Sequence, residues 1–269
     1  MHNPGEIQKE AAFWGRRKLE RGASVCWKLG PLSLWVRRRH HEWWVYAKRD
    51  GPEEEVCEVI EGQQPEESVA WNRWAFTEEK TDVSLLPAAP DRSVVARPDT
   101  PLRIPPGNEV LFFVSVPLWV RVSAGDGQHP VLLTEEPTRV LSNTWFGEPT
   151  EGELCYGLKT GASVELEGVK RGSNRFVCPL LVKNHSPEEL SFRKVCLPVP
   201  YVQLYRGGKR LWSNRISLSY LGKSQFSSVA FDSDAPEYEN GLERVGEPRL
   251  KERRGFFRRS FDTLRSFGG

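Results

Sequence analysis

The chain has 269 residues, a formal net charge of +2 and 10 tryptophans. A chain of this length can bury a core that is stable without disulfides. The amino-terminal residues lack the apolar stretch of a signal peptide, and the longest apolar run, residues 110–120, is too short for a transmembrane helix and contains Pro117. These features argue against a secreted or membrane-spanning protein, so we expect a cytoplasmic one.

The composition favours strands over helices, because 20 prolines and 23 glycines punctuate the chain and long runs of helix formers are scarce. After a possible short helix at 6–14, the first predicted β element is a hairpin, with strands at 32–36 and 42–46 on either side of a basic tip at 37–41. Residues 50–67 are acidic and are predicted to be mostly loop. The next predicted strands, most of them bounded by proline, lie at 83–86, 94–97, 102–104, 110–114 and 118–122.

A second block of strands follows at a spacing of about ten residues, which is typical of an immunoglobulin-like β-sandwich. Its predicted strands are 140–146, 153–158, 176–183, 190–197, 202–205, 211–212, 216–220 and 226–231. The predicted fold is therefore mainly β, with two β-sandwich domains and a carboxy-terminal amphipathic helix. The predicted domains are residues 1–135, an amino-terminal β-sandwich, and 136–234, an immunoglobulin-like β-sandwich, followed by 235–269, an acidic linker and a basic helix.

The tail has the pattern of a basic amphipathic helix. At 100° per residue, five large apolar side chains fall within about 140°, and four arginines occupy the opposite side. The apolar residues are Phe256, Phe257, Phe261, Leu264 and Phe267, and the basic residues are Arg254, Arg258, Arg259 and Arg265. Because so short a helix is unstable alone, it should fold on its own domain, on a protein partner or on an anionic membrane.

The cysteines and histidines suggest no metal, cofactor or disulfide framework. The five cysteines, Cys26, Cys57, Cys155, Cys178 and Cys196, are scattered and include no C-x-x-C pair. The adjacent His40 and His41 would point to opposite faces of a strand. We therefore expect reduced, mostly buried thiols and no bound metal.

Several stretches resemble a known family. They are Pro31-Leu32 with Glu42-Trp43, the segment from Pro101 to Gly107, Val116-Pro117-Leu118-Trp119-Val120, and above all Ser142-Asn143-Thr144-Trp145-Phe146-Gly147 followed by Gly152-Glu153-Leu154-Cys155-Tyr156. Residues 13–231 resemble an uncharacterised prokaryotic family, domain of unknown function 432. The resemblance implies no catalytic residues. Some members are encoded beside mechanosensitive-channel proteins, so it implies a membrane-adjacent role and a membrane channel protein as a candidate partner.

The sequence shows no catalytic signature, because it contains no G-x-S-x-G, H-E-x-x-H or G-x-G-x-x-G pattern, and this favours a protein that is not an enzyme. The most distinctive candidate for a ligand site is Asn143, Trp145, Glu148, Glu153 and Tyr156. Aromatic rings can stack on a sugar while amide and carboxylate groups hydrogen-bond to it, and paired carboxylates can support glycoside hydrolysis.

A structural interpretation of the same segment is the simpler one. In it, residues 147–152 form a tight turn, Trp145 and Leu154 pack on the core, and the acids face water. The basic hairpin tip at 37–41 could contact nucleic acid, but the chain outside the tail is slightly acidic, which argues against that partner.

The leading functional expectation is a non-catalytic binding or accessory protein that uses its basic tail to engage a protein partner or the inner face of an anionic membrane. The alternative is a carbohydrate-binding or carbohydrate-cleaving β-sandwich protein centred on the turn at Trp145. The two differ in the residues they need, because the first depends on the tail and the second on the turn.

Overall fold

A computed structural model describes residues 13–52, 56–66, 68–100, 102–222, 226–251 and 257–263. The chain divides into two compact units, and each is built from separate stretches of sequence. Unit 1 comprises Met1–Ala88, Pro117–Val140 and Gly172–Asn174, and unit 2 comprises Ala89–Val116, Leu141–Arg171 and Arg175–Gly269. This division differs from the contiguous domains expected at 1–135 and 136–234, because strands far apart in the sequence pair within each unit.

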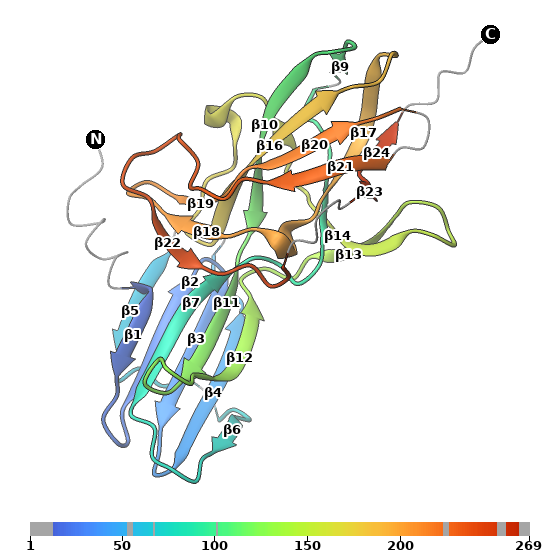
Figure 1. Ribbon diagram of the computed structural model, residues 1–269. Helices are drawn as coiled ribbons and strands as arrows, with labels where there is room; N and C mark the ends of the chain where they lie inside the picture. Colours follow the sequence, from blue (N-terminus) through green and yellow to red (C-terminus); the bar gives the residue numbers. More distant parts are fainter. Residues whose placement is uncertain are drawn as a thin grey trace. The chain divides into compact units, whose positions relative to one another are not determined.

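The protein is mainly β, as predicted. In unit 1 the strands form two antiparallel sheets, one in the order β1-β7-β11-β12 and one in the order β5-β2-β3-β4-β6 (Figure 1). The strands are β1 (Gly15–Lys18), β2 (Ser24–Leu29), β3 (Leu32–Arg38), β4 (Glu42–Arg49), β5 (Cys57–Glu61), β6 (Asn72–Ala75), β7 (Asp82–Ala88), β11 (Trp119–Ala124) and β12 (Val131–Pro137).

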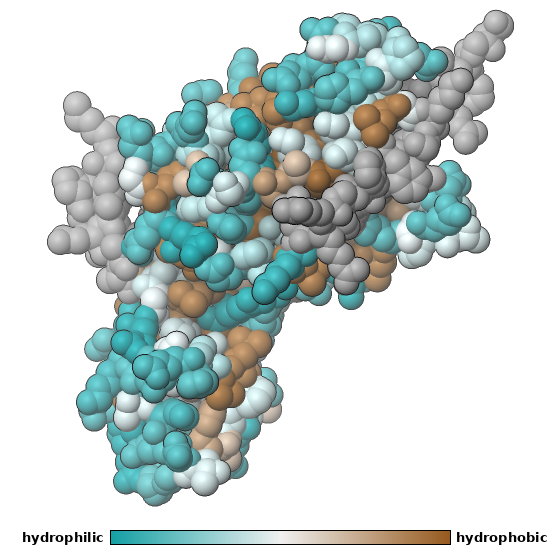
Figure 2. Space-filling model, in the orientation of Figure 1, coloured by the Kyte–Doolittle hydropathy of each residue, from teal (hydrophilic) through white to brown (hydrophobic). Residues whose placement is uncertain are grey.

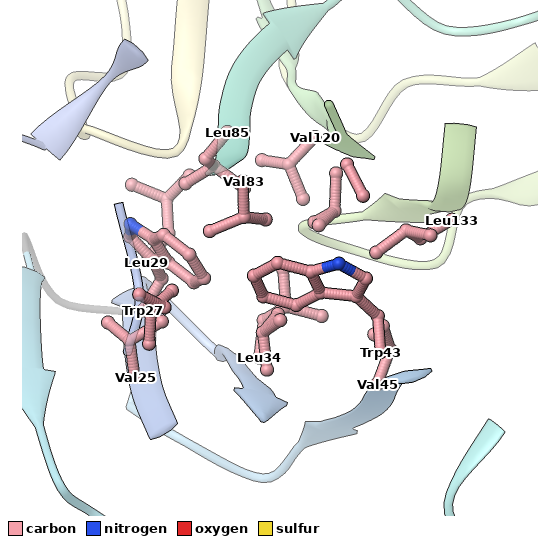
Figure 3. Close-up of a cluster of buried hydrophobic side chains, with 14 of the residues drawn as sticks. Val25, Trp27, Leu29, Leu34, Trp43, Val45, Val83, Leu85, Val120 and Leu133 are labelled. Carbon is pink, nitrogen blue, oxygen red and sulfur yellow. The ribbon is translucent and has the colours of Figure 1, made fainter. Parts of the chain in front are cut away.

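The two sheets of unit 1 share one hydrophobic core. Figure 3 shows the Trp43 indole in the middle of this cluster, between side chains of one sheet, such as Leu34, and side chains of the other, such as Val83 and Leu133. Alternation explains the arrangement, since Trp43 and Val45 of β4 face the core while the intervening Trp44 does not.

The predicted basic hairpin is confirmed as β3 and β4, which pair antiparallel up to Arg38 and Trp43. Two of the three arginines of its tip, Arg38 and Arg39, make contacts within the protein. The Arg38 guanidinium is buried, donates to the Leu19 carbonyl at 2.5 Å and pairs with Glu79 at 2.8 Å. Arg39 lies over the Trp44 ring, 5.1 Å from its centroid. The tip is therefore less solvated than the sequence suggested.

Unit 2 combines a nine-stranded and a six-stranded sheet. Its strands are β8 (Val94–Ala96), β9 (Arg103–Ile104), β10 (Glu109–Pro117), β13 (Ser142–Phe146), β14 (Glu153–Gly157), β15 (Ala162–Ser163), β16 (Arg175–Asn184), β17 (Leu190–Leu197), β18 (Leu204–Arg206), β19 (Leu211–Ser213), β20 (Ile216–Tyr220), β21 (Phe226–Phe231), β22 (Glu243–Gly246), β23 (Phe257–Arg259) and β24 (Phe261–Thr263). Two short 3-10 helices, Leu166–Gly168 and Val199–Tyr201, complete the regular structure of the described residues.

Strand β16 is the centre of the larger sheet and is buried along nearly its whole length. It pairs in parallel with both β19 and β20, and β14 of the smaller sheet pairs in parallel with β8. A strand that has parallel neighbours and is buried on both faces usually has a continuous run of apolar residues in its sequence. The run from Phe176 to Val182 has this character, which is why its position could be predicted while its parallel pairing could not.

The predicted carboxy-terminal helix is wrong. Two short strands stand in its place: β23 pairs with β21, and β24 pairs with β17 (Figure 1). A short amphipathic segment gains little from helix formation alone, so pairing with existing strands decides its structure. Within this part, Phe257, Arg258 and Arg259 belong to β23 and Phe261 belongs to β24. The other expected tail residues, Arg254, Phe256, Leu264, Arg265 and Phe267, lie outside the described residues.

The segment before the tail packs on unit 2, although it was expected to be a linker. The Tyr238 ring stacks on Trp212, with centroids 5.6 Å apart, and the Trp212 Nε1 donates to the Glu239 carboxylate at 2.9 Å. Strand β22 then pairs with β18. In the part of the chain that is described, no helix is both long enough and apolar enough to cross a bilayer.

Candidate functional site

The distinctive segment at Trp145 forms a hairpin of β13 and β14 that extends from unit 2 in Figure 1. Its turn closes on one carbonyl, that of Glu148, which accepts from the backbone N–H of Gly152 at 2.8 Å and from the Trp145 Nε1 at 2.9 Å. Gly147 takes a φ of 105°, which favours glycine. The sequence prediction of a tight turn at 147–152 is confirmed. Figure 2 shows the end of this hairpin, at the right of the view, as hydrophilic.

Gly152 has no room for a side chain, and this gives a first prediction. A Cβ at this position would lie 2.4 Å from the Trp145 Nε1 and 2.7 Å from the Glu148 carbonyl oxygen. We expect Gly152→Ala to open the turn and to lower the free energy of unfolding by about 1–3 kcal/mol. Thermal melting followed by circular dichroism measures this change.

Gly157 is the matched control on the same hairpin, because a Cβ there would meet its nearest neighbours at 3.8 Å. Gly157→Ala should therefore leave the melting temperature almost unchanged. Equal destabilisation by the two substitutions would contradict the close packing at Gly152.

The outer edge of the hairpin offers free backbone positions. Tyr156 directs its backbone N–H toward β8, where it donates to Ser93 O at 2.9 Å, so Tyr156 and Leu154 form the non-hydrogen-bonded pairs with β13. Their partners, Asn143 and Trp145, consequently direct N–H and C=O away from β14. Strand β13 is the edge of its sheet among the described strands, so these groups face outward.

One face of the hairpin carries an exposed apolar pair. Trp145 and Leu154 lie directly opposite each other, and they are 49% and 45% exposed. Side chains of a non-hydrogen-bonded pair are the closer kind of cross-strand neighbours. The expectation that both residues pack on the core is therefore wrong, because the strand presents them on its outward face.

The same face continues into a polar cluster at Asn143 and Tyr156, which also lie opposite each other. The Asn143 Oδ1 accepts from the Arg92 guanidinium at 3.3 Å, and the Tyr156 hydroxyl donates to Asp91 at 2.9 Å. The pKa of Tyr156 is raised, first by burial and then by this hydrogen bond to the Asp91 carboxylate. Arg92 also lies over the Tyr156 ring, 5.4 Å from its centroid.

The opposite face of the hairpin points inward and carries Glu153 and Cys155. The Sγ atoms of Cys155 and Cys196 are 3.7 Å apart, and the Cys196 thiol donates to the Glu153 carboxylate at 3.5 Å. The three donor atoms all lie within 4.8 Å of one another. Both thiols are fully buried beside Val95 and Phe146.

The pKa values of the two thiols are shifted in opposite directions. The contact with Cys196 lowers the pKa of Cys155, because a Cys155 thiolate could accept a hydrogen bond from the thiol that remains. The same contact raises the pKa of Cys196 well above its usual value, and burial adds to that rise. The pair can therefore lose one proton much more easily than two.

The structure separates the five residues proposed from the sequence. Asn143, Trp145 and Tyr156 share the outward face, Glu148 lies exposed in the turn, and Glu153 lies on the inward face. Two neighbours of this site were missed. Strand alternation could have placed Cys155 beside Glu153, but nothing in the sequence links Cys196 to them, since it comes from a different strand.

The comparisons with known proteins give one result. No curated protein and no solved structure matches the chain. A family model does match, over residues 13–265, and its description is "Protein of unknown function (DUF432)". The match extends past residue 231, where the expected resemblance ended, and takes in strands β22 to β24. The chain therefore belongs to the DUF432 family.

Proposed function

We propose that this protein is a non-catalytic binding protein that engages a partner protein through the outer edge of the β13–β14 hairpin. One observation carries this proposal: the exposed pair of Trp145 and Leu154 borders a strand edge whose Asn143 and Trp145 backbone groups face outward. An extended segment of a partner can add to such an edge, with main-chain hydrogen bonds supplying affinity and a side-chain contact supplying specificity.

The composition of β13 supports binding at this edge. Proteins usually protect an exposed edge with lysine, proline or a bulge, and β13, Ser-Asn-Thr-Trp-Phe, contains none of these. Tryptophan is also the residue type most enriched at the energetic centres of interfaces, where its loss costs about 2 kcal/mol or more. An unprotected edge beside an exposed tryptophan is thus a favourable place for a partner strand.

The charge of the turn supports a particular chemistry for the partner. Glu151 is exposed at the end of the hairpin, next to the Trp145 and Leu154 pair. A complementary segment would carry an apolar side chain over that pair and a lysine or arginine beside the Glu151 carboxylate. We therefore propose an extended, basic and apolar segment as the partner.

The experiment uses Asn143, whose backbone N–H faces outward. Asn143→Pro deletes this donor without deleting a hydrogen bond between β13 and β14, as proline is tolerated on an outward-facing edge. A photo-crosslinking amino acid at position 154 captures the partner in cells. We expect capture to fall by about tenfold or more in the Asn143→Pro background.

Asn143→Ala is the matched control, because it removes the same contact with Arg92 and keeps the backbone N–H. Capture should persist in that variant. A crosslinker at Leu86, an exposed residue of unit 1, controls for non-specific adducts. Capture that is equal at positions 154 and 86, or that is unaffected by proline, would refute the proposal.

Carbohydrate binding at Trp145 is the second candidate. The observation that supports it is that Asn143, Trp145 and Tyr156 share one exposed face, so a ring platform stands beside polar groups. Hydrolysis has less support, because Glu153 lies on the other face. Quenching of tryptophan fluorescence by sugars that is lost in Trp145→Ala and weakened in Asn143→Ala would favour this candidate.

One apolar residue of the tail is buried in the fold and is not available to a partner or membrane. Phe261 is fully buried in unit 2. Among the five apolar residues of the expected helical stripe, it is the one whose side chain the structure describes. A membrane-adjacent role, with a membrane channel protein as partner, therefore needs a contact other than Phe261.

A β-sandwich is the architecture that we propose for unit 1, supported by the core that its two sheets share.

A further inference from the structure

The inward face of the β13–β14 hairpin carries a cluster of two cysteines and a glutamate that the proposed function does not use. Cys155 and Glu153 belong to one strand at i and i+2, so alternation directs both to the same face. Cys196 comes from β17, which is separated from β14 by β8. Two thiols and one carboxylate, all possible metal ligands, thus lie together on the inward face of the sheet. The Cys155 and Cys196 Sγ atoms are 3.7 Å apart, and the Cys196 Sγ is 3.5 Å from the Glu153 Oε1.

These separations match those of ligands on one tetrahedral metal ion. With Zn–S near 2.3 Å and Zn–O near 2.1 Å, a tetrahedral angle places two sulfur ligands about 3.8 Å apart and a sulfur and an oxygen about 3.6 Å apart. We propose that Cys155, Cys196 and Glu153 bind a thiophilic divalent cation of the Zn²⁺ class. The arrangement provides three protein ligands and leaves a fourth coordination position for water or another small donor.

A disulfide fits the same residues less well. Neighbouring strands lie about 4.8 Å apart, so β14 and β17, with β8 between them, are about 9–10 Å apart. A disulfide requires a Cα separation of about 4.4–6.8 Å. Bond formation would therefore require the sheet to collapse over β8, whereas a metal ion bridges the existing gap between the sulfur atoms.

The surroundings suit a metal site. Val95 and Phe146 make an apolar shell beside the thiols, and the Ser93 hydroxyl hydrogen-bonds to Cys196. Outer hydrogen bonds of this kind orient ligands and favour the thiolate that a metal requires. Glu153 is only half-buried, so the carboxylate offers a path of entry from solvent.

The test is cobalt binding by the full-length protein, purified under reducing conditions and treated with a chelator. Co²⁺ replaces Zn²⁺ at tetrahedral sites and gives a thiolate charge-transfer band. We expect one Co²⁺ per chain, with the band lost on addition of Zn²⁺. Loss of an outer-shell partner typically weakens metal binding by about 10- to 100-fold. Cys155→Ser and Cys196→Ser each remove a ligand itself, so each should weaken Co²⁺ binding by at least that factor.

Two further variants keep the test decisive if a cysteine substitution unfolds the protein. Glu153→Gln, at a half-buried position, should retain the thiolate band and bind Co²⁺ at least about tenfold more weakly. Cys178→Ser, which removes a buried thiol outside this cluster, should bind like the native protein. A native protein without a thiolate band, or cobalt binding that survives both Cys155→Ser and Cys196→Ser, would overturn the proposal.

Discussion

Replacing Phe261 by alanine is expected to lower the free energy of unfolding by about 3–5 kcal/mol, the usual cost of removing a buried phenylalanine ring. Phe261 is fully buried, and its ring packs on Phe192 and Tyr220 at centroid distances of 5.0 and 5.8 Å. Urea denaturation followed by far-ultraviolet circular dichroism measures the loss. A loss of this size would show that strand β24 of the tail is an integral part of the fold of unit 2.

The control for Phe261 is Leu250, which lies earlier in the same carboxy-terminal region and is 48% exposed. Leu250→Ala should change stability by no more than about 0.5 kcal/mol. If Phe261→Ala were equally mild, the tail would not be an integral strand, and the basic amphipathic segment would again be available for a membrane or a partner.

Replacing Trp43 by alanine should be comparably damaging in unit 1. The indole is 1% exposed and occupies the middle of the core shared by the two sheets (Figure 3). Its loss leaves a cavity that the facing residues Val83, Val120 and Leu133 cannot fill without moving, which costs about 3–5 kcal/mol. Tryptophan fluorescence can follow this transition, since only Trp145 and Trp212 belong to unit 2.

Trp74 provides a matched control for Trp43, because it is the cross-strand partner of Trp43 on β6 and is 39% exposed. We expect Trp74→Ala to cost about 1 kcal/mol or less, as is usual for surface positions. A larger loss from Trp74→Ala than from Trp43→Ala would contradict the central burial of Trp43.

The sequence was informative where strand signals are local. The hairpin of β3 and β4 and the hairpin of β13 and β14 were both predicted, because each has strand-forming residues on either side of a recognisable turn. Pairing between distant segments was not predictable in this way. The parallel pairs of β16 with β19 and β20, and the division into discontinuous units, depend on contacts far apart in the sequence.

The carboxy-terminal tail shows why periodicity can mislead. Its apolar and basic residues fit opposite sides of a helix, but a short segment has too little helical stability of its own to resist pairing with β21 and β17. Phenylalanine also has a high strand propensity. Tertiary pairing therefore decided the outcome, and the buried Phe261 shows the result.

The turn at 147–152 was predicted from the sequence, but the structural interpretation assigned the two faces of its strands the wrong way round. Trp145 is followed by Phe146, and Leu154 is followed by Cys155, so apolar residues are available to both faces of each strand. A shift of one residue then exchanges the inward and outward sets. Phe146 and Cys155 face inward and leave Trp145 and Leu154 exposed.

Amide hydrogen exchange tests most directly whether β13 is an open edge for a partner strand. In the free protein, the N–H groups of Asn143 and Trp145 should exchange faster than those of Thr144 and Phe146, which point toward β14. Adding the partner captured at position 154 should slow the exchange of Asn143 and Trp145. Exchange at these two amides that stays fast in the complex would contradict strand addition at β13.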